Sequence, residues 1–235
     1  MQIRAFAFSL SPNLKNVEML TFAEEITLLA LDDKSGTLMH LPERSLDFAL
    51  AGALMLELAF KGRINTDEAF VEVLSRKPTG DVMLDQAMLL IPNTPNLTIQ
   101  SALARIAKKG DHWERKTLDS LVAKGVLTKK EDKFLWVMRE RTYPILDNEK
   151  VREVHDRIRS VVMDSDLTPP PRDVALIALM NACELSCAVF TPDEIEKYRD
   201  RIEKISKMDF IAQAVAHSIS EIQNAILEVI AFSGI

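Results

Sequence analysis

The chain has 235 residues, 47% of them apolar, 27% charged and only 7 of them glycine, which excludes a disordered or fibrous protein. It has no run of 18 or more uncharged apolar residues, and its first residues lack the apolar core and cleavage site of a secretory signal, so we expect a cytoplasmic protein without a membrane-spanning helix. The net charge of −6 argues against indiscriminate binding to nucleic acid.

The first predicted element is a helix that begins at Thr21. Thr21 and Glu24 have the spacing of a capping box, in which the hydroxyl and the carboxylate each accept a hydrogen bond from an unpaired amide. We expect residues 1–19 to form an arm before this helix. Residues 20–235 are expected to form a single compact, mainly α-helical bundle with a surface β-hairpin.

The second helix, expected from Ser45 to Lys61, is apolar on almost every side. Such a helix is predicted to be the central, buried one of the bundle. Its carboxylate Glu57 would then be buried as well. We interpret Glu57 as an ion-pair partner that ties helices together, for instance with Arg63, in preference to a general acid or base.

Apolar spacing predicts helices in most of the remaining chain, separated by short stretches that contain proline. The expected helices begin at about Asp67 and then cover 98–109, 111–124, 148–163, 172–190, 193–208 and 210–232.

One stretch predicts the β-hairpin: Gly125 is followed by a short strand at 126–128, a charged turn at 129–133 and a second strand at 134–138. Cations beside bulky apolar side chains suit a contact with a membrane interface. The candidate residues for this contact are Lys129, Lys130, Lys133, Phe134, Leu135 and Trp136. Two alternatives stay open: the lysines only block pairing at a strand edge, or the hairpin mediates self-association into a homo-oligomer.

Positive charge is concentrated in the middle of the chain. From Ser101 to Ser160 there are 15 Lys and Arg against 10 Asp and Glu, which leaves a net −11 for the rest. A basic zone on an acidic protein suggests a face for an anionic partner such as a membrane surface, although an ordinary solvated surface would give the same count.

Motifs for catalysis and metal binding are missing from the sequence. It has no nucleophile elbow, no glycine-rich phosphate loop and no His-Glu-x-x-His pair, so we expect no enzyme activity, no cofactor and no metal. Cys183 and Cys187 lie four residues apart in an expected helix and are predicted to share a buried face. The histidines lack the spacing of metal ligands; they are His40, His112, His155 and His217.

Four segments in the same order resemble the Golgi phosphoprotein three family. They are LTFAEEITLLALDDKSG from Leu20, GALMLELAFKGRI from Gly52, PTGDVMLDQA from Pro78 and LVAKGVLTKKEDKFLWVMRERTYPI from Leu121. The resemblance implies a helical bundle with a surface hairpin. It also implies a peripheral protein that reads phosphatidylinositol 4-phosphate on the cytosolic face of a membrane and holds the cytosolic tails of membrane proteins.

The phosphate pocket that this resemblance implies takes a Trp before the central helix, an Arg within it and two Arg on the helix before the hairpin. These positions fall on Leu41 or Pro42, on Ala51, and on Asp111 and Glu114. Carboxylates at two of them would repel a phosphomonoester. We therefore expect a diverged head-group site on an anionic phospholipid membrane, with substitute candidates at Arg44, Arg115 and Lys116.

Two other functions are compatible with the pattern. A basic helix followed by a hairpin is also the outline of a winged-helix nucleic-acid binder, but Asp111, Glu114 and Asp119 would face the phosphates, so nucleic acid is the less favoured partner. The other is a protein-only oligomeric scaffold whose hairpin binds a partner strand. The leading prediction is a non-enzymatic, peripheral membrane adaptor.

Overall fold

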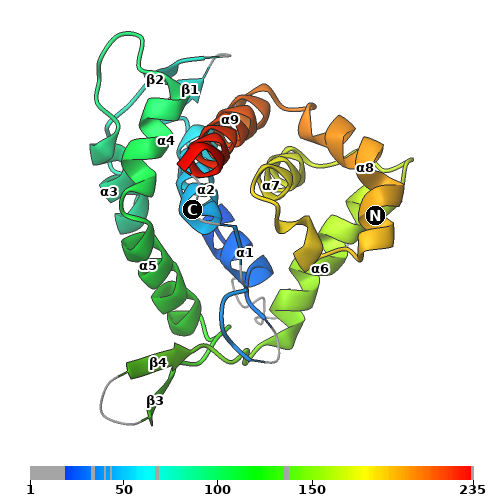
Figure 1. Ribbon diagram of the computed structural model, residues 1–235. Helices are drawn as coiled ribbons and strands as arrows, with labels where there is room; N and C mark the ends of the chain where they lie inside the picture. The colour runs from blue at the N-terminus through cyan, green and yellow to red at the C-terminus, as the bar shows by residue number, and fades with distance from the viewer. Residues whose placement is uncertain are drawn as a thin grey trace, which may run out of the picture.

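The described part of the chain is mainly α-helical. A computed structural model gives the backbone of residues 19–32, 35–39, 41–42, 44–66, 69–134 and 138–233, and their side chains except at 131–134, 138–141 and 225–233. The helices form one bundle, from which a β-hairpin projects (Figure 1), and this confirms the predicted fold class. The expected arm at 1–19 lies outside the described residues, apart from Met19.

Three groups of helices make up the bundle (Figure 1). The central group consists of α1 (Phe22–Leu29), α2 (Ser45–Phe60), α7 (Pro171–Ala182) and α9 (Phe210–Ser233). An outer layer on one side consists of α3 (Val82–Leu90), α4 (Ile99–Ala107) and α5 (Gly110–Ala123). On the other side α6 (Asn148–Met163) and α8 (Pro192–Ser206) pack against each other and against α7.

Helix α2 is the central buried helix, as its all-round apolar sequence predicted. Every residue from Phe48 to Leu56 is buried. Gly52 lets two neighbouring helices come close, because a Cβ atom there would lie 2.7 Å from Cδ1 of Leu179 on α7 and 2.9 Å from Cδ1 of Ile219 on α9. The core of the bundle is therefore built around α2.

A small hairpin replaces the helix that was expected to begin at about Asp67. Strands β1 (Ile64–Thr66) and β2 (Val71–Val73) pair antiparallel, with Ile64 opposite Val73. Residues 67–68 lie outside the described part of the chain. The prediction of a helix was wrong here because β-branched residues at alternate positions favour a strand, and Ile64, Thr66 and Val71 turn their side chains inward.

The larger hairpin was predicted, but its turn was placed wrongly. Strands β3 (Lys130–Phe134) and β4 (Met138–Thr142) pair with Lys130 opposite Thr142 and Phe134 opposite Met138. An isolated bridge between Leu127 and Ile145 has the same register, so one ladder runs from the bundle into the hairpin. In that register the predicted turn at 129–133 lies mostly within β3 and is paired with β4, so it is not the turn of the hairpin.

The helix expected over 172–190 is also shorter than predicted. Helix α7 ends at Ala182, and Glu184 has a left-handed φ of 58°, after which a 3₁₀ turn, η1 (Leu185–Ala188), begins. Cys183 is buried, and burial raises the pKa of its thiol, whereas Cys187 is exposed on η1. The expected shared face of the two cysteines was wrong because the helix breaks between them.

Candidate functional site

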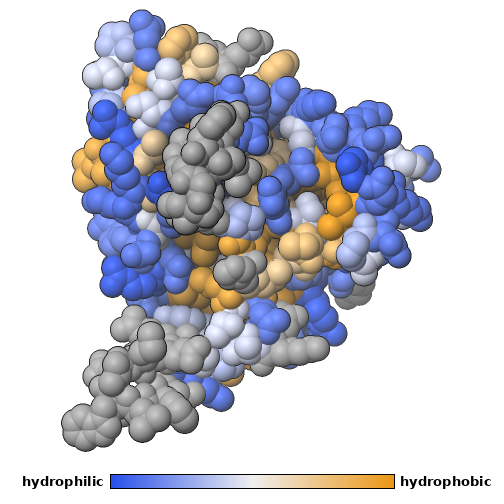
Figure 2. All heavy atoms as spheres, viewed as in Figure 1, coloured by the Kyte–Doolittle hydropathy of each residue, from blue (hydrophilic) through white to orange (hydrophobic). Residues whose placement is uncertain are grey.

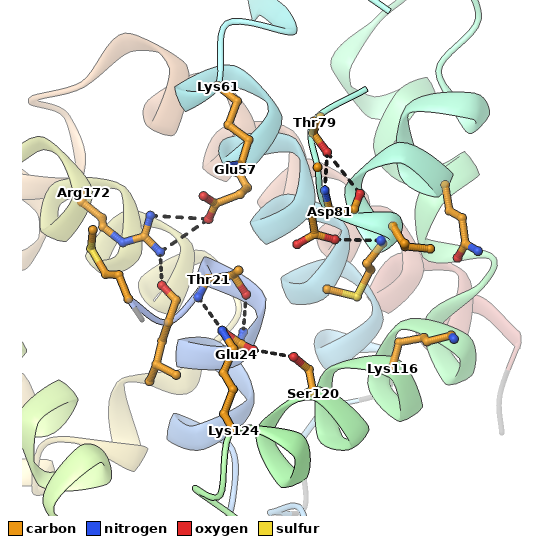
Figure 3. A pocket seen from close by; sticks show the side chains of 16 residues that line it. Thr21, Glu24, Glu57, Lys61, Thr79, Asp81, Lys116, Ser120, Lys124 and Arg172 are labelled. Carbon is orange, nitrogen blue, oxygen red and sulfur yellow. Dashed lines mark hydrogen bonds and ion pairs between the residues drawn. The ribbon is translucent and has the colours of Figure 1, made fainter. Parts of the chain in front are cut away.

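A pocket of about 600 Å³ opens where α1, α2, α3, α5 and the start of α7 meet (Figure 3). A pocket of this size is large enough for a small ligand or a side chain of a partner. Four cationic and three acidic side chains contribute to its wall: Lys61, Lys116, Lys124, Arg172, Glu24, Glu57 and Asp81.

Glu24 joins α1 to α5 on one side of the pocket. Its carboxylate accepts hydrogen bonds from the Thr21 amide at 2.7 Å, from Ser120 Oγ at 2.8 Å and from Lys124 Nζ at 2.9 Å (Figure 3). The Thr21 hydroxyl in turn accepts from the Glu24 amide, so the predicted capping box is confirmed. Glu24 and Lys124 therefore stabilise the contact between α1 and the end of α5.

Glu57 joins α2 to α1 and α7 on another side. Its Oε2 accepts from the Phe22 amide at 3.1 Å. The same atom lies 3.4 Å from Nη1 and Nη2 of Arg172 (Figure 3). The structural interpretation of Glu57 is confirmed, but its partner is Arg172. Arg63, the partner suggested from the sequence, instead donates to the carbonyl of Pro78 at 3.1 Å.

Behind this wall two half-buried arginines form a network with the buried carboxylates of Glu25 and Asp173. Arg172 also donates to the Leu20 carbonyl at 2.7 Å and lies 3.4 Å from Glu25 Oε2. Arg157 on α6 approaches Glu25 at 2.5 Å and Asp173 at 2.8 Å. Burial raises the pKa of both carboxyls even though the arginines pull it down. The network fixes α1, α6 and α7 relative to one another.

The third carboxylate of the pocket wall, Asp81, caps α3 by accepting from the Met83 amide at 2.7 Å and the Leu84 amide at 3.2 Å. Two cations of the wall remain available for a ligand. Lys61 and Lys116 are exposed and form no ion pair with any carboxylate that the structure describes. Figure 3 shows them on opposite sides of the pocket, so each is a separate contact for an anionic group there.

The predicted head-group candidates lie in different surroundings. Arg44 has a left-handed φ of 62°, pairs with Asp47 at 3.2 Å and stacks over the ring of Phe48 at 5.1 Å. Arg115 donates from Nε to the Asp111 carbonyl at 3.0 Å. Lys116 lines the pocket, and the structure places neither arginine in the pocket wall.

The positions at which the resemblance implied a phosphate pocket lie in an acidic neighbourhood. Ala51 is fully buried, and the start of α5 lies so close to α2 that a Cβ on Gly110 would be 1.8 Å from Asp47 Oδ1. Partial burial, and then the negative charges of Asp111 and Asp47, raise the pKa of Glu114. Three carboxylates thus surround a place where the resemblance implied arginines.

The hairpin candidates are only partly described. Lys129 and Lys130 are exposed, and Lys129 Nζ lies 4.0 Å from Asp119 Oδ1. Both lysines lie where β3 leaves the bundle, so their expected position at the turn was wrong. The backbone positions of Lys133 and Phe134 are in β3, whereas Leu135 and Trp136 lie outside the described residues.

Two of the histidines, which lack the spacing of metal ligands in the sequence, have ordinary structural contacts. His112 Nε2 lies 3.0 Å from Gln86 Oε1, and His217 Nε2 lies 3.5 Å from Glu221 Oε1. His40 is outside the described residues. Within the described ranges, no three His, Cys, Asp or Glu residues gather as potential metal ligands, and no helix is long and apolar enough to cross a membrane.

Sequence reasoning missed the pocket because its wall comes from distant parts of the chain. Glu24 and Lys124 are 100 residues apart, and Glu57 and Arg172 are 115 apart. The one local signal was the carboxylate of Glu57 in an apolar helix. Lys61, Lys124 and Arg172 resemble any other surface cations in the sequence.

The sequence matches a known protein family over most of its length. The family model described as Golgi phosphoprotein 3 (GPP34) matches residues 22–222. Two relatives carry the name vacuolar protein sorting-associated protein 74. The one from Schizosaccharomyces pombe is 26% identical over 223 residues, which cover 81% of this chain and 65% of that protein. The one from Eremothecium gossypii is 31% identical over 181 residues, which cover 67% of this chain and 51% of that protein, so this chain spans between about half and two thirds of these relatives.

Proposed function

The chain belongs to the Golgi phosphoprotein 3 family, and from this membership we propose that it is a peripheral membrane adaptor and not an enzyme. The observation that carries the proposal is the family match over residues 22–222, which includes both the bundle and the hairpin. The two relatives are named for vacuolar protein sorting. The adaptor would bind a membrane surface with one face and the tail of a membrane protein with another.

The proposed membrane ligand is an anionic phospholipid, and phosphatidylinositol 4-phosphate is the first to test. The basic zone from Ser101 to Ser160 supports this choice. It covers α5, the hairpin and most of α6, whereas the rest of the chain is acidic. The hairpin is the proposed apolar contact, through Phe134, Leu135 and Trp136 with Lys129, Lys130 and Lys133 beside them.

We place no head group at the inherited positions. The carboxylates of Asp47, Asp111 and Glu114 would meet a phosphomonoester there, and like charges at short range disfavour binding. Of the substitute candidates, Lys116 is the best supported, since it shares the pocket wall with Lys61. Arg44 and Arg115 remain candidates of lower rank because each already has a local partner.

Flotation with liposomes tests the proposed function. Vesicles of phosphatidylcholine alone, with phosphatidylserine, and with phosphatidylinositol 4-phosphate separate neutral, generally anionic and phosphoinositide-selective binding. We expect the protein to float with anionic vesicles, and Trp136→Ala to lower the bound fraction. A matched control is Phe210→Ala, because Phe210 is an aromatic residue that is 82% exposed at the start of α9.

The outcomes separate the functions that the sequence left open. Absence of binding to all three vesicles would contradict the proposal. A mass that rises with protein concentration would then favour the protein-only scaffold, and a salt-dependent shift of DNA in a gel would favour the nucleic-acid binder.

A further inference from the structure

A second basic feature lies outside the pocket described above, in a groove between α3 and α4. The groove has a volume of about 370 Å³ and is lined by Leu89, Leu90, Pro92, Arg105, Lys108 and Lys109. Its wall thus combines three cations with three apolar residues and contains no carboxylate. We call it the α3–α4 groove.

The side chains of the three cations of the groove are exposed to solvent. None of them forms an ion pair with a carboxylate in the described part of the chain. Beside the groove, burial first and then Lys116, Lys109 and Arg115 lower the pKa of His112, so cations also lie on the side of α5 that carries His112, while Asp111, Glu114 and Asp119 are on the same helix. An anion that approached this face would meet several positive charges and no compensating negative charge in the groove.

The apolar part of the groove projects into solvent. Leu89 is 79% exposed, and Val82, which lies on the same helix at the edge of the first pocket and not in the groove, is 69% exposed. Seven residues separate them, which is about two turns, so both lie on the outer face of α3. Figure 2 shows apolar atoms at the edge of the molecule over α3, bordered by hydrophilic side chains. Exposed aliphatic side chains next to cations are typical of proteins that contact the interfacial region of a membrane.

The groove lies on the same side of the molecule as the hairpin. In Figure 1, α3, α4 and α5 form the outer layer on one side, and β3 and β4 project from the end of that layer. The groove differs from the inherited phosphate position, where Asp111 and Glu114 lie next to Asp47 of α2. One membrane could therefore contact the groove and the hairpin together.

We propose that the α3–α4 groove binds the phosphate of an anionic phospholipid within a membrane, with Arg105, Lys108 and Lys109 around the phosphate and Leu89 and Val82 in the interfacial region. The proposal rests on the proposed membrane association and assigns it a place on the helical body. The three cations favour an anionic ligand. The exposed Leu89 favours a lipid surface over an acidic peptide, because a lipid surface also offers an apolar contact.

Charge reversal tests the basic part of the groove. The test variant is Arg105→Glu/Lys108→Glu/Lys109→Glu, and the matched control is Lys197→Glu/Lys204→Glu/Lys207→Glu on and just after α8, on the other side of the bundle, with the same change in net charge. The readout is the partition coefficient on phosphatidylcholine vesicles with phosphatidylserine. We expect the groove variant to lose about 100-fold and the control at most a few-fold, because each cation near the surface strengthens binding several-fold.

A second variant tests the apolar part without touching the cations. Leu89→Asn, which adds no charge, is expected to lower the partition coefficient as well, whereas Leu167→Asn, at an exposed site before α7, should change it little. Melting curves of all variants are the check that the fold is kept. Inorganic phosphate is the soluble probe, and we expect it to compete weakly with the vesicles.

The outcomes distinguish this inference from the proposed function. Equal loss in the groove and control variants would show that only net charge matters and would overturn the groove. Full binding by the groove variant would overturn it while leaving membrane association intact. If the unmodified protein binds no vesicle at all, the proposed function fails and the groove fails with it.

Discussion

Arg172 shows how one side chain connects the pocket wall to the core. It binds Glu57 of α2, Glu25 of α1 and the Leu20 carbonyl, and its guanidinium lies 4.0 Å from the centre of the Phe22 ring. Glu25 is almost fully buried, so its charge depends on this arginine and on Arg157. Arg172 thus has a structural role before any role toward a ligand.

The variant Arg172→Met should destabilise the protein by about 3 kcal/mol, because it leaves buried carboxylates with less compensating charge while keeping the apolar stem. Urea denaturation measures the loss. The control Arg199→Met removes a cation from an exposed pair with Glu196 and should cost less than about 1 kcal/mol. A loss as small as that of the control would show that the network contributes little.

Glu194 gives the protein a predictable response to acid. Arg159, first of all, and then the Thr191 amide hold the pKa of Glu194 at about 2, below its ordinary value of 4.5. Between these two pH values the unfolded chain takes up a proton that the folded protein does not, so stability falls as the pH falls. The contribution is complete above pH 4.5 and is lost toward pH 2.

We therefore expect Glu194→Gln to be less stable than the unmodified protein at neutral pH, and the difference to close as the pH falls toward about 2. Denaturation midpoints measured at several pH values give the two curves. Glu203→Gln, in an exposed pair with Lys207 at 3.8 Å, is the control and should show no such closure. Parallel curves for Glu194→Gln would contradict the assignment.

At the scale of elements, Gly36 connects the loop after α1 to the base of the hairpin. Its φ is +67°, its carbonyl accepts from the Tyr143 amide at 2.6 Å, and a Cβ atom would lie 2.8 Å from the Pro144 nitrogen. Backbone atoms cannot move aside as a flexible side chain can. A side chain at this position would therefore destabilise the fold in two ways, through the left-handed φ and through the clash with the Pro144 backbone.

Gly36→Ala should destabilise the protein by about 2–4 kcal/mol, part from the left-handed conformation and part from the backbone clash. Gly62→Ala is the matched control, with a φ of +61° but nothing within 4 Å of its Cβ position, and should cost only about 1 kcal/mol. Thermal melting of both variants makes the comparison. Equal losses would mean that the approach of Pro144 has no energetic effect.

Elements with a strong local signal could be predicted from the sequence, and those set by distant contacts could not. The apolar run of α2 and the capping box of α1 depend on residues close in the chain, and both predictions were confirmed. The hairpin turn was misplaced because its register follows from the bridge between Leu127 and Ile145. The end of α7 was missed because Glu184 adopts a left-handed φ without a glycine or proline to announce it.

For the whole molecule, the arrangement separates a buried bundle from a projecting hairpin. The strands β3 and β4 pack mainly on each other, whereas the helices share one core around α2 (Figure 1). Basic residues gather on the outer layer and at the base of the hairpin, and acidic residues dominate elsewhere in the sequence. With this arrangement we expect that changes in the hairpin alter what it binds without unfolding the bundle.

Replacing residues 130–142 by an Asn-Gly turn tests this separation. The ladder register puts Lys129 opposite Tyr143, so a two-residue turn can join them while the bridge between Leu127 and Ile145 is kept. We expect the free energy of unfolding to change by less than about 1 kcal/mol, because the backbones of β3 and β4 lie close to each other and have few contacts with the helices. Binding to anionic vesicles should fall, since the proposed apolar contact is lost, but it should not vanish if the α3–α4 groove also binds. Loss of folding in this variant would show that the hairpin is part of the core. A change from an oligomeric to a monomeric mass in sedimentation would show that the hairpin joins subunits.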